Sequence, residues 1–179
     1  AQKAGGPQEL RYILERQLDS FRRNGAGRDE TTRARLETLV QRIAAASFEF
    51  QDNVNNDVRT IEVTAADLSG LPTEVRGAFP VAANGTARIA ADEIAVRSIL
   101  EYSDNGSLCK QVVQAYGSRG WPANDAVFKR LVADRAELAK LLGYETYAHY
   151  HLADHMVRTP RNLKAFIDQT AASLRVRSD

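Results

Sequence analysis

Apolar residues recur every three or four positions over most of the chain, which is the period of an amphipathic helix. The first such stripe covers residues 8 to about 24 and ends at Gly25 and Gly27. A second stripe follows Asp29, whose side chain suits a helix N-cap, and it extends almost to residue 57. The pattern therefore predicts two long helices joined by a short turn, which is an antiparallel helical hairpin.

The apolar period changes to two in the middle of the chain. Residues 59–64 read RTIEVT, and residues 86–90 read TARIA. These segments predict one small β-hairpin, which has to pack against helices because two strands are marginally stable alone. Between the strands, Pro72 suits the first turn of a short amphipathic piece that ends near Phe79.

The helical period returns after residue 91. We expect one helix over residues 93–102, capped by Asp92, and a short helix over residues 107–116. A turn at residues 104–106 separates them. A loop is expected over residues 117–124, before the next helical stripe begins at Phe128.

The strongest stop and start signals lie between residues 140 and 147. Gly143 suits the left-handed position that ends a helix, and Thr146 can cap the next one. The pattern carries this next helix to Met156, and we expect Pro160 to stop it. A last helix is predicted to start near Asn162.

These elements predict a mainly α fold of antiparallel helical hairpins and a bundle, with one small β-hairpin. We expect residues 1–179 to form a single helical segment and residues 1–7 to be a loose lead-in. The length suits one domain or a piece of a larger protein. The chain begins with Ala1 rather than Met, so we expect an expression product, a processed form or a fragment.

Charge and cysteine content narrow the function classes. With 24 basic and 23 acidic residues, the chain gives no electrostatic reason to expect a nucleic-acid or membrane partner. No apolar run approaches the roughly 20 residues that span a bilayer, and the N-terminus lacks a signal-peptide layout. The single cysteine, Cys109, excludes an internal disulfide and fits a reducing compartment, so we expect a cytoplasmic location.

Three groups of residues form a specific pattern in chain order. They are Leu68-Ser69-Gly70-Leu71-Pro72, then Tyr102-Ser103-Asp104-Asn105 with Ala115-Tyr116, then Arg135, Leu141-Leu142-Gly143-Tyr144, Tyr147-Ala148 and Met156. Together they resemble the zinc oligopeptidase family of thimet oligopeptidase, oligopeptidase F and dipeptidyl carboxypeptidase. The resemblance covers residues 8–174. It departs from the family at Gly106 and Cys109, where arginines are common.

The resemblance implies a non-catalytic part of a peptidase. In the family this mostly helical region precedes the catalytic part and helps form one wall of a channel for short peptides. The zinc ligands, a His-Glu-x-x-His helix and a later glutamate, lie further toward the C-terminus, and this chain contains neither. The resemblance therefore implies no catalytic residue, metal ligand or cofactor in this chain, with zinc in the parent enzyme, and it does not indicate which residues touch substrate. The expected partner is the remainder of the peptidase chain, and the isolated segment should be inactive.

The histidines offer an alternative chemistry. His151 and His155 are four positions apart, as two metal ligands on one helix face would be, and His149 lies nearby. A zinc peptidase needs a glutamate after the first histidine as general base, and Leu152 holds that place. We predict no tight metal site. Two alternatives stay open: a free-standing helical binding module of the same ancestry, and a weak metal site at this cluster.

The remaining candidates favour structural roles. Cys109 has no histidine beside it in sequence, so a buried, inert thiol is expected. The acidic residues at Asp52, Asp57, Asp67 and Glu74 show no pairing typical of acid–base catalysis.

Arg135 interrupts an apolar stripe between Leu131 and Leu138, where an arginine can snorkel, pair with an acid or face a functional cleft. We predict a charge-assisted pair with Glu101 or Asp104.

Overall fold

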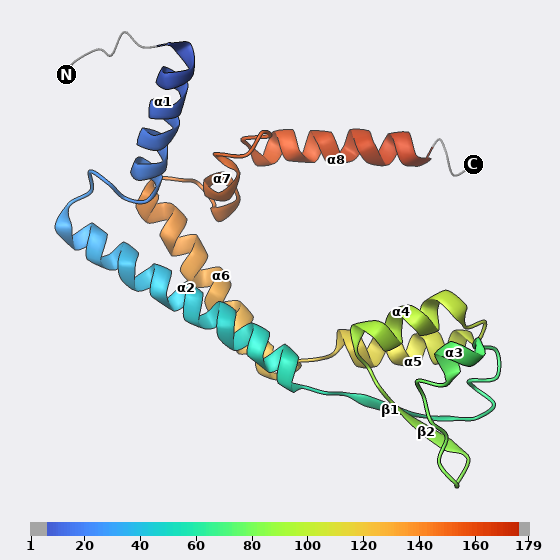
Figure 1. The fold of residues 1–179 in the computed structure, drawn as a ribbon. Helices are drawn as coiled ribbons and strands as arrows, with labels where there is room; N and C mark the ends of the chain where they lie inside the picture. The colour runs from blue at the N-terminus through green and yellow to red at the C-terminus, as the bar shows by residue number, and fades with distance from the viewer. Residues whose placement is uncertain (1–6, 176–179) are drawn as a thin grey trace. The chain divides into compact units, whose positions relative to one another are not determined.

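The computed structural model describes residues 7–175 and divides into two compact units (Figure 1). The first unit contains the chain up to Ala46 and from Lys129 onward, and the second is Ser47–Phe128. The described residues form eight helices and one two-stranded antiparallel sheet, which confirms the predicted mainly α class with a single β-hairpin. Most of the predicted lead-in, residues 1–6, lies outside the described residues.

Two long helices, α2 (Glu30–Asn56) and α6 (Ala123–Leu142), run through both units. The other helices of the first unit are α1 (Gln8–Arg23), α7 (Tyr147–Leu152) and α8 (Pro160–Arg175). The second unit holds strands β1 (Thr60–Thr64) and β2 (Thr86–Ala90) and helices α3 (Thr73–Arg76), α4 (Glu93–Tyr102) and α5 (Gly106–Gly117). None of the helices that the structure describes is long and apolar enough to cross a membrane.

The turn between α1 and α2 follows the predicted local chemistry. Gly25 has φ +89°, and an added Cβ would come within 2.6 Å of the Leu36 side chain. Asp29 then accepts hydrogen bonds from the backbone N–H and the hydroxyl of Thr32, at 2.8 and 2.6 Å. The glycine permits the tight turn, and the aspartate satisfies a free donor at the start of α2.

Within the first unit, α2 and α6 pack through a leucine seam. Leu36 and Leu39 of α2 are buried with Leu138 and Leu142 of α6. Five partly buried side chains pack around these leucines: Ile43, Leu141, Tyr144, Tyr147 and Tyr150. Both helices present leucines at helical spacing, so burial of this shared apolar stripe holds them together.

The end of α6 and the start of α7 confirm the predicted signals. Gly143 adopts φ +88°, and the N–H of Tyr144 donates to the carbonyl of Ala139 across the turn. Thr146 accepts the N–H of His149 through its side chain, as an N-cap does. The glycine thus stops α6, and the threonine starts α7 after a short connection.

Three predicted boundaries in the C-terminal half were wrong. Helix α7 ends at Leu152, well before Met156, which is 99% exposed. Pro160 does not stop a helix but opens α8, where its missing N–H costs nothing, and the Thr159 hydroxyl accepts from the N–H of Asn162. Helix α6 begins at Ala123 within the expected loop, because Asn124 is buried and donates to the carbonyl of Phe50.

In the second unit the two predicted strands pair with each other. Ile61 lies opposite Ile89 in the antiparallel sheet. Asp92 caps α4 by accepting the N–H of Ala95, and Asn105 caps α5. Pro72 sits one position before α3, which ends earlier than the expected Phe79.

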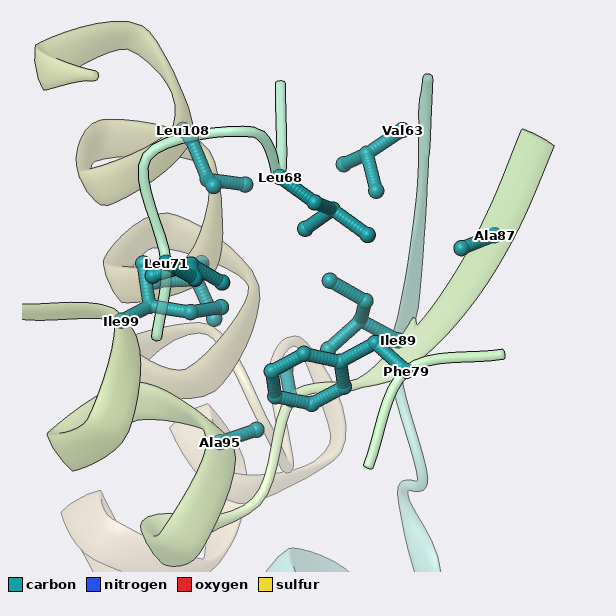
Figure 2. Packing of buried hydrophobic residues seen from close by; sticks show 11 residues of the cluster. Val63, Leu68, Leu71, Phe79, Ala87, Ile89, Ala95, Ile99 and Leu108 are labelled. Atoms are coloured by element: carbon teal, nitrogen blue, oxygen red, sulfur yellow. The ribbon is translucent and has the colours of Figure 1, made fainter. Parts of the chain in front are cut away.

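The core of the second unit lies between the sheet and helices α4 and α5. In Figure 2, Leu68 lies between Val63 of β1 and Leu108 of α5. Six side chains of this cluster are at most 2% exposed: Leu68, Ala87, Ile89, Ile99, Leu108 and Val112. The helices thus bury the apolar face that a two-stranded sheet cannot bury alone.

Candidate functional site

The first unit carries a ladder of aromatic rings around the α6–α7 turn. Tyr144 and Tyr150 meet edge to face with ring centroids 5.4 Å apart, and Tyr150 lies 5.7 Å from Tyr147. His151 stacks on Tyr147 at 6.0 Å, and His155 follows at 4.9 Å. Such spacings are typical of favourable aromatic contacts. Burial raises the pKa of the Tyr150 hydroxyl, so this hydroxyl is neutral near pH 7.

Arg135 lies against this ladder, and its predicted pair with Glu101 or Asp104, which belong to the second unit, stays a prediction. Its Cζ atom lies 5.2 Å from the ring centroid of Tyr147, in a cation–π contact. The Nε atom of Arg135 is buried without a hydrogen-bond partner among the described residues. The turn at Gly143 brings α7 back toward α6, so the ring of Tyr147 faces the guanidinium of Arg135.

The buried charge of this helix is the neighbouring residue, Asp134. It is 3% exposed, and its Oδ1 accepts from Arg42 Nη2 of α2 at 2.5 Å. Its Oδ2 is buried and has no hydrogen-bond partner in the described structure. Sequence reasoning missed Asp134, although it lies three residues after Leu131 and four before Leu138, on the same helical face.

An open cleft of about 900 Å³ lies beside the ladder, within the first unit. The polar face of α1, the α6–α7 turn and residues 153–158 line it. Arg23 donates to Asp154 at 2.8 Å, and Arg28 donates to the carbonyl of Leu142 at 2.9 Å. The second contact satisfies a carbonyl at the end of α6 that has no partner within the helix. No local pattern of residues indicates this cleft, because its walls are distant in the chain.

The Arg23–Asp154 pair makes a pH-dependent contribution to stability. The hydrogen bond from Arg23 holds the pKa of Asp154 at about 2, below its ordinary 3.8. A carboxylate with a lowered folded-state pKa stabilises the fold above its unfolded pKa and loses that effect as pH falls through the folded pKa. Since the Asp154 side chain is 40% exposed, solvent screening limits the contribution to about 1 kcal/mol or less.

We therefore expect Asp154→Asn to lower the free energy of unfolding at pH 7, and the difference from wild type to fade between about pH 4 and pH 2. Urea titrations at several pH values measure it. Asp168→Asn is the control, because its pair with Lys164 is 61% and 75% exposed and should contribute little at any pH. A wild-type-minus-variant difference that stayed constant down to pH 2 would contradict the assignment.

The histidines do not form a donor set that fits zinc. His149 lies 2.9 Å from the Thr146 hydroxyl, and His155 lies 3.1 Å from Asp154. Since α7 ends at Leu152, His151 and His155 do not share a helix as predicted, although their rings are close. Within residues 7–175 no three His, Cys, Asp or Glu side chains are grouped to hold a metal ion. Absence of tight zinc binding stays a prediction.

Two of the predicted acidic candidates hold local structure. Asp57 accepts from Arg59 and from the N–H of Gly120, and both contacts lower its pKa. Asp67 accepts from the hydroxyl and N–H of Thr64, which likewise lowers its pKa. Saturated by donors, these carboxylates are poor proton acceptors.

The other two acids stand apart from the first two, and the cysteine packs against the core of the second unit. Asp52 and Glu74 are exposed, and the structure does not bring them together with Asp57 or Asp67. Cys109 is half-buried rather than buried, with its Sγ 3.7 Å from the carbonyl of Ser103.

The residues that carry the family resemblance mostly support the fold. Leu68 and Leu71 are core residues of the second unit. Asn105 caps α5 and donates to Asp67 at 3.1 Å, and the Arg119 guanidinium lies 4.0 Å from the ring centroid of Tyr116. These motifs therefore position helices and turns.

Comparison with known proteins gives the same relationship. A family model described as Peptidase family M3 matches residues 99–177. A probable thimet oligopeptidase of Arabidopsis thaliana is 29% identical over 93% of this chain and 23% of its own length. The mitochondrial intermediate peptidase of Phaeosphaeria nodorum is 27% identical over 89% of this chain and 20% of its own length. Oligopeptidase A of Haemophilus influenzae is 27% identical over 88% of this chain and 25% of its own length.

The matches extend over nearly the whole sequence but over a small part of each relative. The chain spans about a fifth to a quarter of the length of these curated relatives. They confirm the resemblance that the three motifs indicated. Residues 99–177 match Peptidase family M3, and nearly the whole chain is similar to a segment of these oligopeptidases.

Proposed function

We propose that this chain is a non-catalytic helical segment of a zinc-dependent oligopeptidase and that it forms part of one wall of the peptide channel. The family match and the partial coverage of the relatives support this assignment. The 179 residues contain no His-Glu-x-x-His, so the zinc and the groups that activate water belong to the rest of the polypeptide. The whole enzyme hydrolyses short peptides.

The orientation of α1 is the observation that carries the proposal. Its polar face lines the cleft, so its apolar stripe points away from the unit that contains it. Five large side chains of this stripe are between 44% and 59% exposed: Leu10, Ile13, Leu14, Leu18 and Phe21. An amphipathic helix of a stable protein buries such a stripe. The remainder of the peptidase chain covers it.

Helix α8 repeats this arrangement at the other end of the described chain. None of its residues is buried, and Phe166, Ile167 and Leu174 are 59%, 54% and 61% exposed. The family match includes this helix. Two amphipathic helices with uncovered apolar stripes fit a segment whose partner is the rest of the same polypeptide.

We expect the 179-residue chain to hydrolyse no peptide, with or without added zinc, because no residue in it can place a metal-bound water and a general base together. A quenched fluorescent peptide of short length measures cleavage by this chain and, in parallel, by the full natural polypeptide. The full polypeptide should be several times longer than 179 residues and active, and a chelator should abolish its activity.

The outcomes separate the proposal from its alternatives. Chelator-sensitive cleavage by the 179-residue chain alone would place a metal enzyme in this segment and overturn the proposal. A natural polypeptide of about 179 residues would favour a free-standing binding module. As a variant, Leu14→Asp with Leu18→Asp should leave the isolated chain folded, because both side chains are exposed there. In the full polypeptide the same change should reduce the yield of folded, active enzyme.

A further inference from the structure

We propose that the cleft between α1 and the α6–α7 turn binds a small multivalent oxyanion, one that carries phosphate or carboxylate groups. The cleft lies wholly within the first unit. The inference does not depend on the peptidase assignment. It rests on the charges that the cleft collects and on how few of its arginines are neutralised.

Arginine dominates the polar lining of the cleft. Five arginines and three carboxylates line it: Arg16, Arg22, Arg23, Arg28 and Arg158, with Glu15, Asp19 and Asp154. The chain as a whole carries a net charge of only +1, so this excess is local. Positive charge gathered in a concave site raises the local concentration of anions.

Three of these arginines already have partners. Arg22 pairs with Asp19, Arg23 pairs with Asp154, and Arg28 donates to the Leu142 carbonyl. These contacts hold guanidinium groups at the wall of the cleft. They also occupy two of the three carboxylates, and the five arginines still exceed the three acids of the lining by two positive charges.

Arg16 and Arg158 have no carboxylate partner among the described residues. Arg16 reaches the hydroxyl of Tyr12 at 3.4 Å and lies over the ring of that residue, 5.9 Å from its centroid. That weak contact leaves most of its N–H donors available. Guanidinium groups bind phosphate and carboxylate oxygens through paired N–H donors, so these two arginines are the expected anion contacts.

Arg158 also occupies an unusual backbone position. Its φ of +57° makes it the one non-glycine residue with positive φ in the described chain. A left-handed conformation costs energy for a side chain with a Cβ, and such residues concentrate at ligand sites. Glycine would relieve the strain, yet an arginine stands at the cleft. This combination favours a role for its guanidinium over a role in the turn alone.

The size of the cleft limits the ligand. A volume of about 900 Å³ falls within the range of small-molecule sites, which hold ligands of drug-like size or less. Tyr12 and Tyr144 add aromatic surface to its walls. A compact anion with two or three charged groups fits both the volume and the pair of unneutralised arginines.

Calorimetric titration of the 179-residue chain with inorganic pyrophosphate and, separately, with citrate tests the proposal. Ionic strength is held constant with sodium chloride, because screening weakens every charge contact. We expect saturable binding of at least one anion. The stronger of the two identifies phosphate or carboxylate as the preferred group, and glycerol serves as the uncharged comparison.

Two variants assign the binding to the cleft. Arg16→Ala and Arg158→Gly should each weaken anion binding about tenfold, the effect of losing one charge-assisted contact. Arg158→Gly also removes the unfavourable φ, so a loss of affinity in a chain at least as stable as wild type cannot be attributed to unfolding. Arg33→Ala removes an equal charge from exposed α2, outside the cleft, and should leave the affinity within about twofold.

Two results would overturn the proposal. One is the absence of saturation by either anion at about 10 mM, which is weaker than a specific site requires. The other is an equal loss of affinity in Arg33→Ala and the cleft variants, which would mean that net charge alone attracts the anion.

Discussion

Replacing Ile99 with alanine is expected to lower the free energy of unfolding by about 3–4 kcal/mol. Ile99 is 0% exposed and lies in the core between the sheet and helices α4 and α5 (Figure 2). Truncation removes buried methyl and methylene groups and leaves a cavity that close-packed neighbours cannot fill. Urea denaturation followed by far-ultraviolet circular dichroism measures the change.

Ile94→Ala on the same helix is the matched control. Ile94 is 69% exposed, so an identical truncation removes little buried surface and should change stability by about 0.5 kcal/mol or less. Both variants replace isoleucine with alanine in the same helix, so the change in helix propensity is the same and burial is the main difference between them. Equal losses in both would contradict the position of this core.

Arg42→Ala is expected to have the second large effect, about 3 kcal/mol of lost stability. Asp134 is buried, and Arg42 pairs with its Oδ1, while Oδ2 has no hydrogen-bond partner among the described residues. Removing the guanidinium therefore leaves a carboxylate in an apolar seam without compensation. The value lies at the low end of the range for buried pairs because the Arg42 side chain is itself 47% exposed.

Two further variants separate this effect from a general loss of charge. Arg35→Ala breaks a pair between the same two helices, but Arg35 and Glu137 are 49% and 38% exposed, so about 0–1 kcal/mol should be lost. Arg42→Ala combined with Asp134→Leu should recover most of the stability, because leucine suits the surrounding seam. If Arg42→Ala cost no more than Arg35→Ala, Asp134 would not be the buried charge that its exposure indicates.

Predictions from local chemistry agreed well with the structure. The cap at Asp92, the stop at Gly143 and the cap at Thr146 each depend on a side chain or backbone within four residues. The pairing of Ile61 with Ile89 follows from the alternation of two short segments, since a shift by one residue would turn the apolar side chains outward. These signals need no knowledge of distant parts of the chain.

Predictions that depended on a distant partner agreed less well. The apolar stripe of α6 correctly predicts its buried face but does not show whether Asp134 or Arg135 meets an opposite charge. Asp134 meets the opposite charge, because Arg42, more than 90 positions away, pairs with it. Arg135 instead contacts the aromatic ring of Tyr147 from α7. Helix α7 is also shorter than its pattern indicates: it ends at Leu152, and the next helix, α8, begins at Pro160.

The sequence by itself determined the helical class, the one β-hairpin, the relationship to Peptidase family M3 and the absence of a His-Glu-x-x-His motif. All of these depend on residue identity and short-range spacing. Only the tertiary structure decided which face of α1 lines the cleft and which stays uncovered. The amphipathic pattern of a helix predicts that one face seeks apolar cover, but the partner is chosen by the elements that the rest of the chain brings beside it.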